Sequence, residues 1–207
     1  MPSNLLRRTF LRQFAGSALA AVPLLGLAGA RPAQALNTQQ ASDLVGRVVE
    51  EIDKAINSGK TGPALYREFE KIFQRYADVN IIAQSVLGVE WRSASNAQRR
   101  AYTEAFAPYI ARKYGRRFQE FVGGRIDVES ARPVRSFFEV KGTAYLRGES
   151  PFEVIFLVSD RSGRDRFFNI IIEGVNLAIT ERAEIGALLD RNGGDLDAMI
   201  RDLRNTQ

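Results

Sequence analysis

The stretch NAQRRAYTEAFAPYIARKYGRRFQEFV, residues 96–122, carries six aromatic side chains at helical spacing. Ser95 and Gln98 have the Ser-x-x-Gln spacing of a capping box, which predicts that a helix begins here. The aromatic residues and Ile110 spread over about half of the helix circumference, which is wider than the stripe of about 100° that seats a helix on a simple core. Pro108 removes a backbone donor, so we expect a kink or a break there.

This aromatic helix has two interpretations. Aromatic side chains at helical spacing usually belong to an ordinary core. A face of this width can also line an apolar cavity, because ligand pockets consist mainly of hydrophobic and aromatic side chains with few polar groups. The rest of the chain has to decide between a filled core and a pocket.

The composition excludes several kinds of active site. The chain has 207 residues, of which 45% are hydrophobic, so we expect one domain with a sizeable core. It contains no cysteine and no histidine. Disulfides, zinc–cysteine sites and iron–sulfur clusters are therefore excluded, and the commonest general base and transition-metal ligand are missing. We expect no catalytic residues, no metal site and no cofactor.

The positive charge of the chain belongs mostly to its N-terminal segment. Residues 1–35 hold four arginines and no acidic residue, and without them the net charge falls from +5 to +1. Basic pairs recur at Arg99-Arg100, Arg112-Lys113 and Arg116-Arg117. A solvated helix face is the ordinary interpretation of these pairs, and contact with anionic lipid head groups or an acidic partner is the alternative. We expect no nucleic-acid binding.

Residues 1–35 have the pattern of an export signal. The sequence from Arg7 to Leu11, Arg-Arg-Thr-Phe-Leu, resembles a twin-arginine signal; an apolar run follows, and Ala33-Gln34-Ala35 is a small-x-small cleavage site. We therefore predict a cleaved signal of the twin-arginine type over 1–35 and a mature chain that begins at Leu36. An uncleaved anchor is the alternative. Since no other stretch has the roughly 20 apolar residues of a spanning helix, we expect a soluble periplasmic protein.

Three helices are expected before the aromatic one. The first begins at Asn37 or Thr38 and ends near residue 57, the second begins at Gly62-Pro63, and the third is capped by Asp78. Trp91 lies in the link to the aromatic helix, where it is expected to close one end of the core.

After residue 124 the hydrophobic period changes from 3.6 to 2, which predicts strands. The alternating apolar sets are Ile126 and Val128; Val134, Phe138 and Val140; Ala144 and Leu146; Phe152, Val154, Phe156 and Val158; and Phe168, Ile170 and Ile172. The later strands are apolar on both faces, which indicates a sheet that is covered on both sides or curled around a cavity. A short strand is expected over 175–179, then helices over about 181–190 and from about 195.

The predicted fold class is α+β: a curved antiparallel β-sheet of about four to five strands packs against N-terminal and C-terminal helices around an apolar cavity. Residues 36–207 form a single domain.

The mature chain resembles the MlaC, or toluene-tolerance, family along nearly its whole length. The motifs that carry the resemblance are Tyr76-Ala77-Asp78, Val86-Leu87-Gly88, Trp91-Arg92-Ser93-Ala94-Ser95, Gln98-Arg99 and Ile172-Glu173-Gly174-Val175-Asn176-Leu177. The chain departs from the family at Arg166-Phe167-Phe168, where Trp and Lys are common, and at Glu181-Arg182, where a Tyr-Arg pair is common. These departures affect the expected ligand and partner contacts more than the expected fold.

The resemblance implies a soluble periplasmic phospholipid carrier that is not an enzyme. Such carriers shuttle phospholipid between an outer-membrane lipoprotein complex and the MCE-domain protein of an inner-membrane ABC transporter, and so maintain outer-membrane lipid asymmetry. The acyl chains lie in an apolar pocket between helices and sheet. Exposing two chains of about 15 methylenes each would cost roughly 24 kcal/mol, so the carrier must enclose them. We expect a monomer.

The expected lipid-binding residues are apolar or aromatic and come from the helices and the sheet. They are Val86, Leu87, Trp91, Phe106, Tyr109, Ile110, Tyr114, Phe118, Phe121, Phe138, Val140, Tyr145, Phe152, Val154, Phe156, Ile170 and Ile172. Each of them could equally be plain core. Arg116, Arg117 and Arg147 are the candidates for the pocket mouth and the head group, with solvated surface charge as the ordinary alternative.

Two other functions stay open. An α+β cone can host a small-molecule isomerase that uses a buried carboxylate and a tyrosine, for which Glu104 near Tyr102, or Glu139, could serve. A periplasmic protein-interaction module is the other alternative. A carboxylate buried in a small pocket would favour the enzyme, a long dry tunnel the carrier, and a packed core without a void the module.

Overall fold

The computed structural model describes residues 35–117 and 123–205. The chain divides into two units, residues 1–34 and residues 35–207. The predicted export signal lies almost entirely in the first unit, outside the described residues, so the signal and its cleavage stay predictions. In the part of the chain that the structure describes, no helix combines the length and the apolar character needed to cross a membrane.

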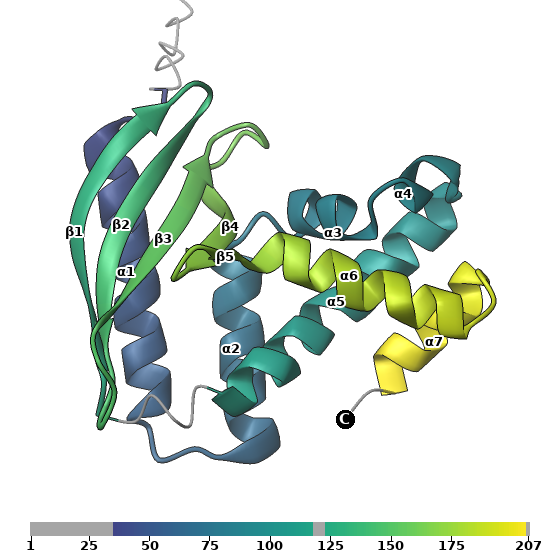
Figure 1. Cartoon of the computed structure of the whole chain (residues 1–207), viewed down its shortest axis with the longest axis horizontal. Helices are drawn as coiled ribbons and strands as arrows, with labels where there is room; N and C mark the ends of the chain where they lie inside the picture. The colour runs from purple at the N-terminus through teal and green to yellow at the C-terminus, as the bar shows by residue number, and fades with distance from the viewer. Residues whose placement is uncertain (1–34, 118–122, 206–207) are drawn as a thin grey trace, which may run out of the picture. The chain divides into compact units, whose positions relative to one another are not determined.

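The three predicted N-terminal helices are present (Figure 1). They are α1 (Thr38–Ile56), α2 (Gly62–Tyr76) and α3 (Val79–Leu87). Asn37 forms a capping box with Gln40 at the start of α1, and Asp78 accepts a hydrogen bond from the amide of Ile81 at the start of α3. Trp91 lies in a further short helix, α4 (Glu90–Ser93), where a link was expected.

The aromatic helix α5 (Asn96–Arg117) begins at the predicted capping box. Ser95 Oγ accepts from the Gln98 amide at 3.1 Å, and the Gln98 side chain accepts from the Ser95 amide at 3.0 Å. The break that could be expected at Pro108 does not occur, since the helix continues through it. Phe106 and Ile110, one on each side of Pro108, are both buried, and their packing holds the helix together across the missing hydrogen bond.

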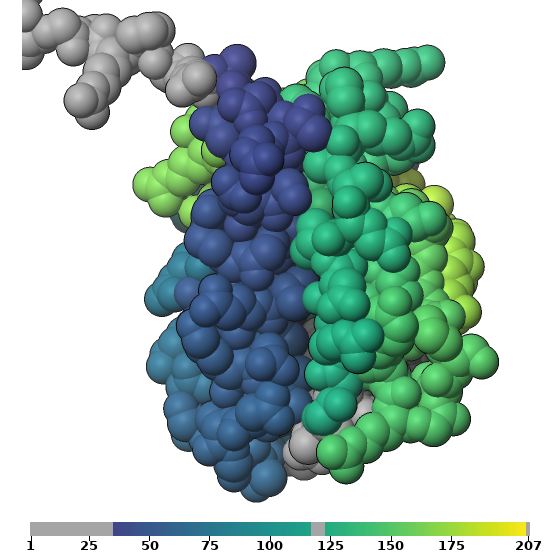
Figure 2. Space-filling model, turned by 90° about the vertical axis from the view of Figure 1, so that its left-hand side faces the viewer, coloured from purple at the N-terminus to yellow at the C-terminus, as the bar shows by residue number. Residues whose placement is uncertain are grey.

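A five-stranded antiparallel meander follows, with strand order β1-β2-β3-β4-β5. The strands are β1 (Arg125–Val134), β2 (Phe137–Tyr145), β3 (Phe152–Ser159), β4 (Arg166–Ile172) and β5 (Val175–Asn176). The sheet is curved (Figure 1), and α1 lies beside β1 along one face of the unit (Figure 2). The predicted α+β class with a curved antiparallel sheet is confirmed.

One predicted strand face is wrong, because β4 contains a bulge. The register between β3 and β4 shifts at Leu157/Val158, which leaves Phe168 as an extra residue. Phe167 therefore points inward and packs edge-on against Phe156, with 5.9 Å between ring centroids. Phe168 lies on the other face, 5.6 Å from the ring of Phe137. Ile170 and Ile172, beyond the bulge, share the inner face with Phe167.

The strand that was expected over residues 175–179 is only two residues long. Helix α6 (Leu177–Arg191) begins directly after Asn176, whose side-chain oxygen accepts from the Ile179 amide at 3.2 Å. The Asn176 side chain caps this helix and so ends β5 early. The last helix is α7 (Leu196–Asn205).

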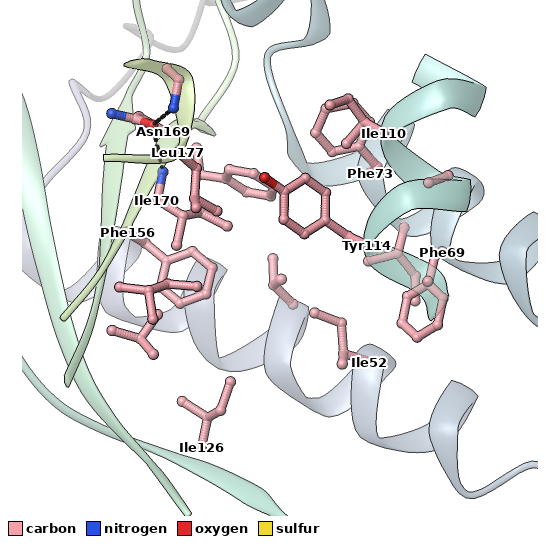
Figure 3. A pocket seen from close by; sticks show the side chains of 18 of the residues that line it. Ile52, Phe69, Phe73, Ile110, Tyr114, Ile126, Phe156, Asn169, Ile170 and Leu177 are labelled. Carbon is pink, nitrogen blue, oxygen red and sulfur yellow. Dashed lines mark hydrogen bonds between the residues drawn. The ribbon is translucent and has the colours of Figure 1, made fainter. Parts of the chain in front are cut away.

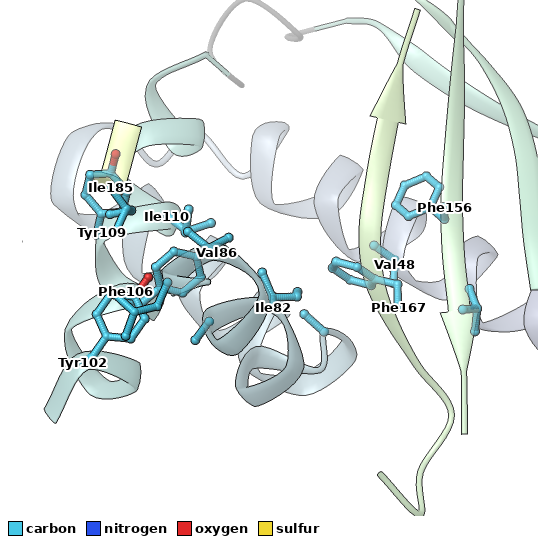
Figure 4. Packing of buried hydrophobic residues seen from close by; sticks show 14 of the residues in the cluster. Val48, Ile82, Val86, Tyr102, Phe106, Tyr109, Ile110, Phe156, Phe167 and Ile185 are labelled. Atoms are coloured by element: carbon cyan, nitrogen blue, oxygen red, sulfur yellow. The ribbon is translucent and has the colours of Figure 1, made fainter. Parts of the chain in front are cut away.

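Fully buried side chains fill the core where α5 packs against α3 and α7 (Figure 4). Tyr102 and Phe106 are both 0% exposed, with 5.6 Å between their ring centroids. Ile185 of α6 and Leu203 of α7 are also fully buried. This end of the molecule is therefore an ordinary packed core.

Candidate ligand-binding pocket

A cavity of about 370 Å³ lies between the sheet and helices α1, α2 and α5 (Figure 3). Its volume falls in the range of roughly 300–1,000 Å³ that is usual for small-molecule pockets. Figure 3 shows Phe156 and Ile170 of the sheet facing Ile52, Phe69 and Tyr114 of the helices across this space. The cavity is thus bounded by elements from both ends of the chain.

The walls follow from the local periodicity of each element. Residues at i, i+4 and i+8 point the same way from a helix, and alternate residues point the same way from a strand. The apolar wall residues are Val48 and Ile52 of α1; Phe69, Ile72 and Phe73 of α2; Ile82 of α3; Phe106, Ile110, Ala111, Tyr114 and Gly115 of α5; Ile126, Leu146, Phe152, Val154, Phe156, Phe167, Ile170 and Ile172 of the sheet and its loops; and Leu177 and Ala178 of α6.

Gly115 allows α2 and α5 to meet closely at one end of the pocket. A Cβ atom added there would lie 2.7 Å from the ring of Tyr66 and 3.3 Å from that of Phe69. Glycine leaves room for both rings because it has no side chain. The sequence alone does not reveal this contact, since Gly115 lies within an otherwise unremarkable helical stretch.

Eight of the residues expected to bind lipid lie together in the pocket wall: Phe106, Ile110, Tyr114, Phe152, Val154, Phe156, Ile170 and Ile172. Val86, Leu87, Tyr109 and Val140 are buried in the packed core instead. Trp91, Phe138 and Tyr145 are half-buried outside the wall; Phe118 and Phe121 lie outside the described residues. Contact of any of these residues with lipid stays a prediction.

Two of the aromatic residues outside the wall are engaged by arginines. The Arg99 guanidinium lies 5.6 Å from the centroid of the Trp91 ring, and its Nε donates to the Trp91 carbonyl at 2.8 Å. The Arg125 guanidinium lies 4.0 Å from the centroid of the Tyr145 ring. Cation–π stacking of this kind accounts for both rings without a ligand.

The sequence did not identify the wall residues of α1 and α2. Ile52 of α1 and Phe69 and Phe73 of α2 lie on the apolar faces of their helices and form part of the pocket wall. Apolar periodicity shows which side of a helix is buried and does not show what it is buried against. No local signal could have separated these residues from plain core.

The main polar group in the wall is the carboxylate of Glu181, in α6, which is only 3% exposed. Its Oε1 accepts from Lys113 Nζ at 2.6 Å and from the Tyr114 hydroxyl at 2.6 Å. Lys113 Nζ also donates to Glu184 Oε2 at 2.5 Å. The other oxygen of Glu181, Oε2, is buried and has no hydrogen-bond partner among the described residues.

The pocket reaches solvent beside two further glutamates. Glu149, in the β2–β3 loop, and Glu173, in the β4–β5 turn, are both exposed and line the cavity. The amide of Glu173 donates to the carbonyl of Glu153 at 3.0 Å, so this turn lies against the start of β3 and the loop that precedes it. The charged side chains in the described wall are therefore carboxylates.

Two of the three arginines expected at the mouth, Arg116 and Arg147, are not part of this wall. Arg116 and Arg147 are exposed, and the Nε of Arg147 lies close to Gly123, 2.7 Å from where a Cβ atom would be. The side chain of Arg117 is outside the described residues. A periodic helix face shows that Arg116 is solvated, but it does not show whether a pocket opens beside it.

Protonation in this region is set by burial and by Glu181. Burial, and next the charge of Glu181, raise the pKa of Tyr109 to about 12. The same two causes also raise the pKa of Tyr102. Burial lowers the pKa of Lys113, but its hydrogen bonds to Glu181 and Glu184 outweigh that effect, so the pKa is raised. At neutral pH Lys113 is therefore charged and both tyrosines are neutral.

The residues considered for an isomerase do not form a site. Tyr102 is fully buried with an unpartnered hydroxyl, Glu104 is exposed in a polar surface cleft beside Asp78, and Glu139 pairs with Arg132. The tyrosine and the carboxylate that do lie together in the pocket wall are Tyr114 and Glu181. Across residues 35–117 and 123–205, no three acidic side chains are grouped so as to hold a metal ion.

A family model, a relative of known name and a solved structure are each similar to this chain. A family model described as MlaC protein matches residues 42–205. The toluene tolerance protein Ttg2D of Pseudomonas putida is 26% identical over 190 residues, which cover 88% of this chain and 84% of that protein. The solved structure of a phospholipid-binding protein from Ralstonia solanacearum, in complex with a phospholipid, has a TM-score of 0.63 and 18% identity, and the match covers 79% of this chain and 98% of that one. The structural likeness shows a common fold.

Proposed function

Since the chain belongs to the MlaC family, we propose that it binds a phospholipid in the pocket between the sheet and the helices and carries it through the periplasm. The observation that supports this proposal is the apolar cavity itself, which reaches solvent beside Glu149 and Glu173. A pocket of this kind can shield acyl chains while the polar head group stays at the opening. The solved structural relative, by its description, holds a phospholipid.

The energetics of acyl chains favour a carrier with an enclosed site. Each methylene gains about 0.8 kcal/mol on leaving water, so an exposed chain is strongly unfavourable. A donor membrane buries the chains as well as the protein does, and transfer between the two is therefore close to neutral. We infer that partner proteins set the direction of phospholipid transport and that the carrier itself catalyses no reaction.

The proposal also includes the protein partners with which the carrier would exchange lipid. The protein would exchange phospholipid between an outer-membrane lipoprotein complex and the MCE-domain protein of an inner-membrane ABC transporter, and would thereby help maintain outer-membrane lipid asymmetry. Export by the signal at residues 1–35 would place it in the periplasm, where both partners are accessible. The eight predicted wall residues, together with Ile52, Phe69 and Phe73, would contact the acyl chains.

A catalytic role is the weaker alternative. The observation in its favour is the Tyr114–Glu181 pair in the pocket. However, the Oε1 atom of Glu181 already accepts from both Lys113 and Tyr114, and the rest of the wall is mostly apolar. The relatives are named for toluene tolerance and phospholipid binding, not for a reaction.

The decisive experiment is native mass spectrometry of the protein expressed as the full-length chain and recovered from the periplasm without detergent, with the released molecules identified. We expect a stoichiometric adduct of phospholipid mass. A protein that is free of lipid, and stays free after incubation with phospholipid vesicles, would contradict the proposal and favour an enzyme or a protein-interaction module.

A further inference from the structure

The expected first residue of the mature chain, Leu36, is fixed in the fold by two contacts. Its side chain is 8% exposed and belongs to the hydrophobic core. Its backbone nitrogen donates to Oδ2 of Asp160 at 3.3 Å. Asp160 lies 124 positions further along the chain, directly after β3. The β3–β4 loop therefore holds the backbone from which α1 begins.

The residues that follow Leu36 continue this anchor into α1. Asn37 and Gln40 close a capping box, in which each side-chain oxygen accepts from the other residue's amide at 2.9 Å. Leu36 and Ala41 hold the two positions of a hydrophobic staple, and both are buried in the same apolar cluster. The start of α1, a helix that forms part of the pocket wall, is thus set by Leu36 and its neighbours.

The predicted cleavage site adjoins this anchor. Ala35 is exposed, whereas Leu36 beside it is buried, and the compact unit of residues 35–207 begins here. A peptidase must hold residues on both sides of the bond that it cleaves. Cleavage therefore takes place while Leu36 is out of this position, and Leu36 docks afterwards.

Cleavage changes the donor that Asp160 meets. Hydrolysis of the Ala35–Leu36 bond by a signal peptidase consumes one water, leaves a carboxylate on Ala35 and gives Leu36 an α-amino group. In the uncleaved chain the Leu36 nitrogen is a neutral amide, and in the cleaved chain it is an ammonium at neutral pH. A carboxylate binds an ammonium more strongly than an amide, because both partners are then charged.

We propose that Asp160 is the binding site for the α-ammonium group of Leu36, so that removal of the export signal creates an ion pair that fixes the start of α1. The inference rests on the cleavage after Ala35, which belongs to the proposed export, and not on lipid binding. It gives Asp160 a role in maturation, because the carboxylate stabilises the processed chain relative to its precursor.

This ion pair differs from an ordinary pair on the surface. Exposed ion pairs contribute little, partly because two long side chains must be held in one geometry. Here the cation lies on the backbone of a residue whose side chain is already buried, so only the short Asp160 side chain has to be ordered. The first turns of α1, the β1–β2 turn and the β3–β4 loop carry further charges at Asp43, Arg135, Arg161, Arg164 and Asp165, besides the Arg132–Glu139 pair.

The test uses pH, because the chain contains no histidine and no cysteine. An α-amino group ordinarily titrates near pH 8, a range in which carboxyl, lysine and arginine side chains do not ordinarily change charge. Pairing with Asp160 raises the pKa of the Leu36 α-amino group, so the stabilisation is complete below about pH 8 and is lost as the pH rises through the raised pKa. The part of the pH-dependent stability that needs Asp160 therefore reports on this ammonium.

The protein is expressed as the full-length chain and recovered from the periplasm, and its intact mass identifies the first residue. Thermal midpoints of wild type and Asp160→Asn are then measured at pH 7 and pH 10. We expect a chain that begins at Leu36 and a midpoint about 2–4 °C lower in the variant at pH 7, with less than half of that difference left at pH 10. Asp165→Asn changes an exposed residue of the same loop and is the matched control, which should follow the wild type at both pH values.

A direct titration keeps the test decisive if Asp160→Asn does not fold. The NMR signal of Leu36, followed against pH in the wild type, should give an α-amino pKa above the ordinary value of about 8. Three results would overturn the inference: a chain that is uncleaved or begins at another residue, a midpoint difference that is the same at both pH values, or an α-amino pKa at its ordinary value. Lipid uptake is measured separately, so the proposed lipid binding is tested independently of all three.

Discussion

The two halves of α5 contain the same kinds of side chain in different surroundings. Tyr102, in the first half, is 0% exposed where the helix packs against α3 and α7. Tyr114, more than three turns later, is half-buried and faces the cavity, with its hydroxyl bonded to Glu181. Figures 3 and 4 show the second and the first environment, respectively.

This difference shows that residue type alone does not separate a core from a pocket. The first half of the aromatic helix belongs mainly to a packed core, and the second half borders a cavity whose use by a ligand stays a prediction. In the first half, helices from the C-terminal part of the chain fill the space opposite the aromatic rings. In the second half, α2 lies close on one side, while the curved sheet stands back on the other and leaves the cavity.

The largest expected effect is a loss of lipid in Ile170→Glu. Ile170 is half-buried and lines the pocket, so a glutamate there places a charge against the acyl chains. We expect at least about a tenfold fall in bound lipid, since an unpaired charge costs well over 1.4 kcal/mol in such a site. The measurement is lipid bound per protein after incubation with vesicles.

The matched control is Ile171→Glu, which makes the same change at the next residue of β4. Ile171 is also half-buried but is not part of the pocket wall. It should retain lipid. Equal losses in two folded variants would show that the cavity is not the lipid site.

The next effect compares Tyr102→Ala with Tyr114→Ala, one substitution in each half of α5. Removing the Tyr102 ring leaves a void in a filled core and should cost about 3–5 kcal/mol of unfolding free energy. Tyr114 already borders a cavity, so its removal should cost only about 1–2 kcal/mol, mostly through the lost hydrogen bond to Glu181. Urea unfolding of both variants measures the difference; equal costs would mean that the second half is packed as tightly as the first.

A smaller effect concerns alkaline pH. The pKa of Tyr109 is raised from 10.0 to about 12, so the folded state holds this proton more tightly than the unfolded state does. The resulting stability is present below pH 10 and is lost as the pH rises towards 12, by at most about 2–3 kcal/mol. The raised pKa of Lys113 acts in the same direction.

Denaturant unfolding of wild type and Tyr109→Phe at pH 9 and pH 11 tests this expectation. The charged neighbours Lys113, Glu181 and Glu184 stay in place in the variant, so the difference isolates the tyrosine. The wild type should lose more stability between the two pH values than the variant. Parallel losses would show that Tyr109 does not contribute.

The smallest effect is a gain in stability from Tyr102→Phe. The Tyr102 hydroxyl is buried without a hydrogen-bond partner among the described residues. Removing an unsatisfied buried hydroxyl while keeping the ring should stabilise the fold by about 1 kcal/mol. A rise in the thermal midpoint, with unchanged lipid uptake, is the expected result, and a fall would indicate that the hydroxyl is satisfied in solution.

Much of the fold could be predicted because its signals are local. The start of the first helix at Asn37 or Thr38, the capping box at Ser95, the cap at Asp78 and the change of period after residue 124 each depend on a few neighbouring residues, and the structure confirms them. The failures came from longer-range effects. Tertiary packing on both sides of Pro108 keeps α5 continuous where a break could be expected. An extra residue in β4 places Phe167, rather than Phe168, on the inner face of the sheet.

The sequence by itself determined the order of the elements, the α+β class and the apolar face of each helix, because caps and periodicity act within one or two turns. Only the tertiary structure decided which of those faces enclose a cavity and that, among the described side chains, glutamates rather than arginines border it. The position of Glu181 beside Lys113 and Tyr114 joins residues 67 or more positions apart. Such contacts depend on how the curved sheet, the close approach at Gly115 and the bulge in β4 set the distances between elements, and no local pattern encodes those distances.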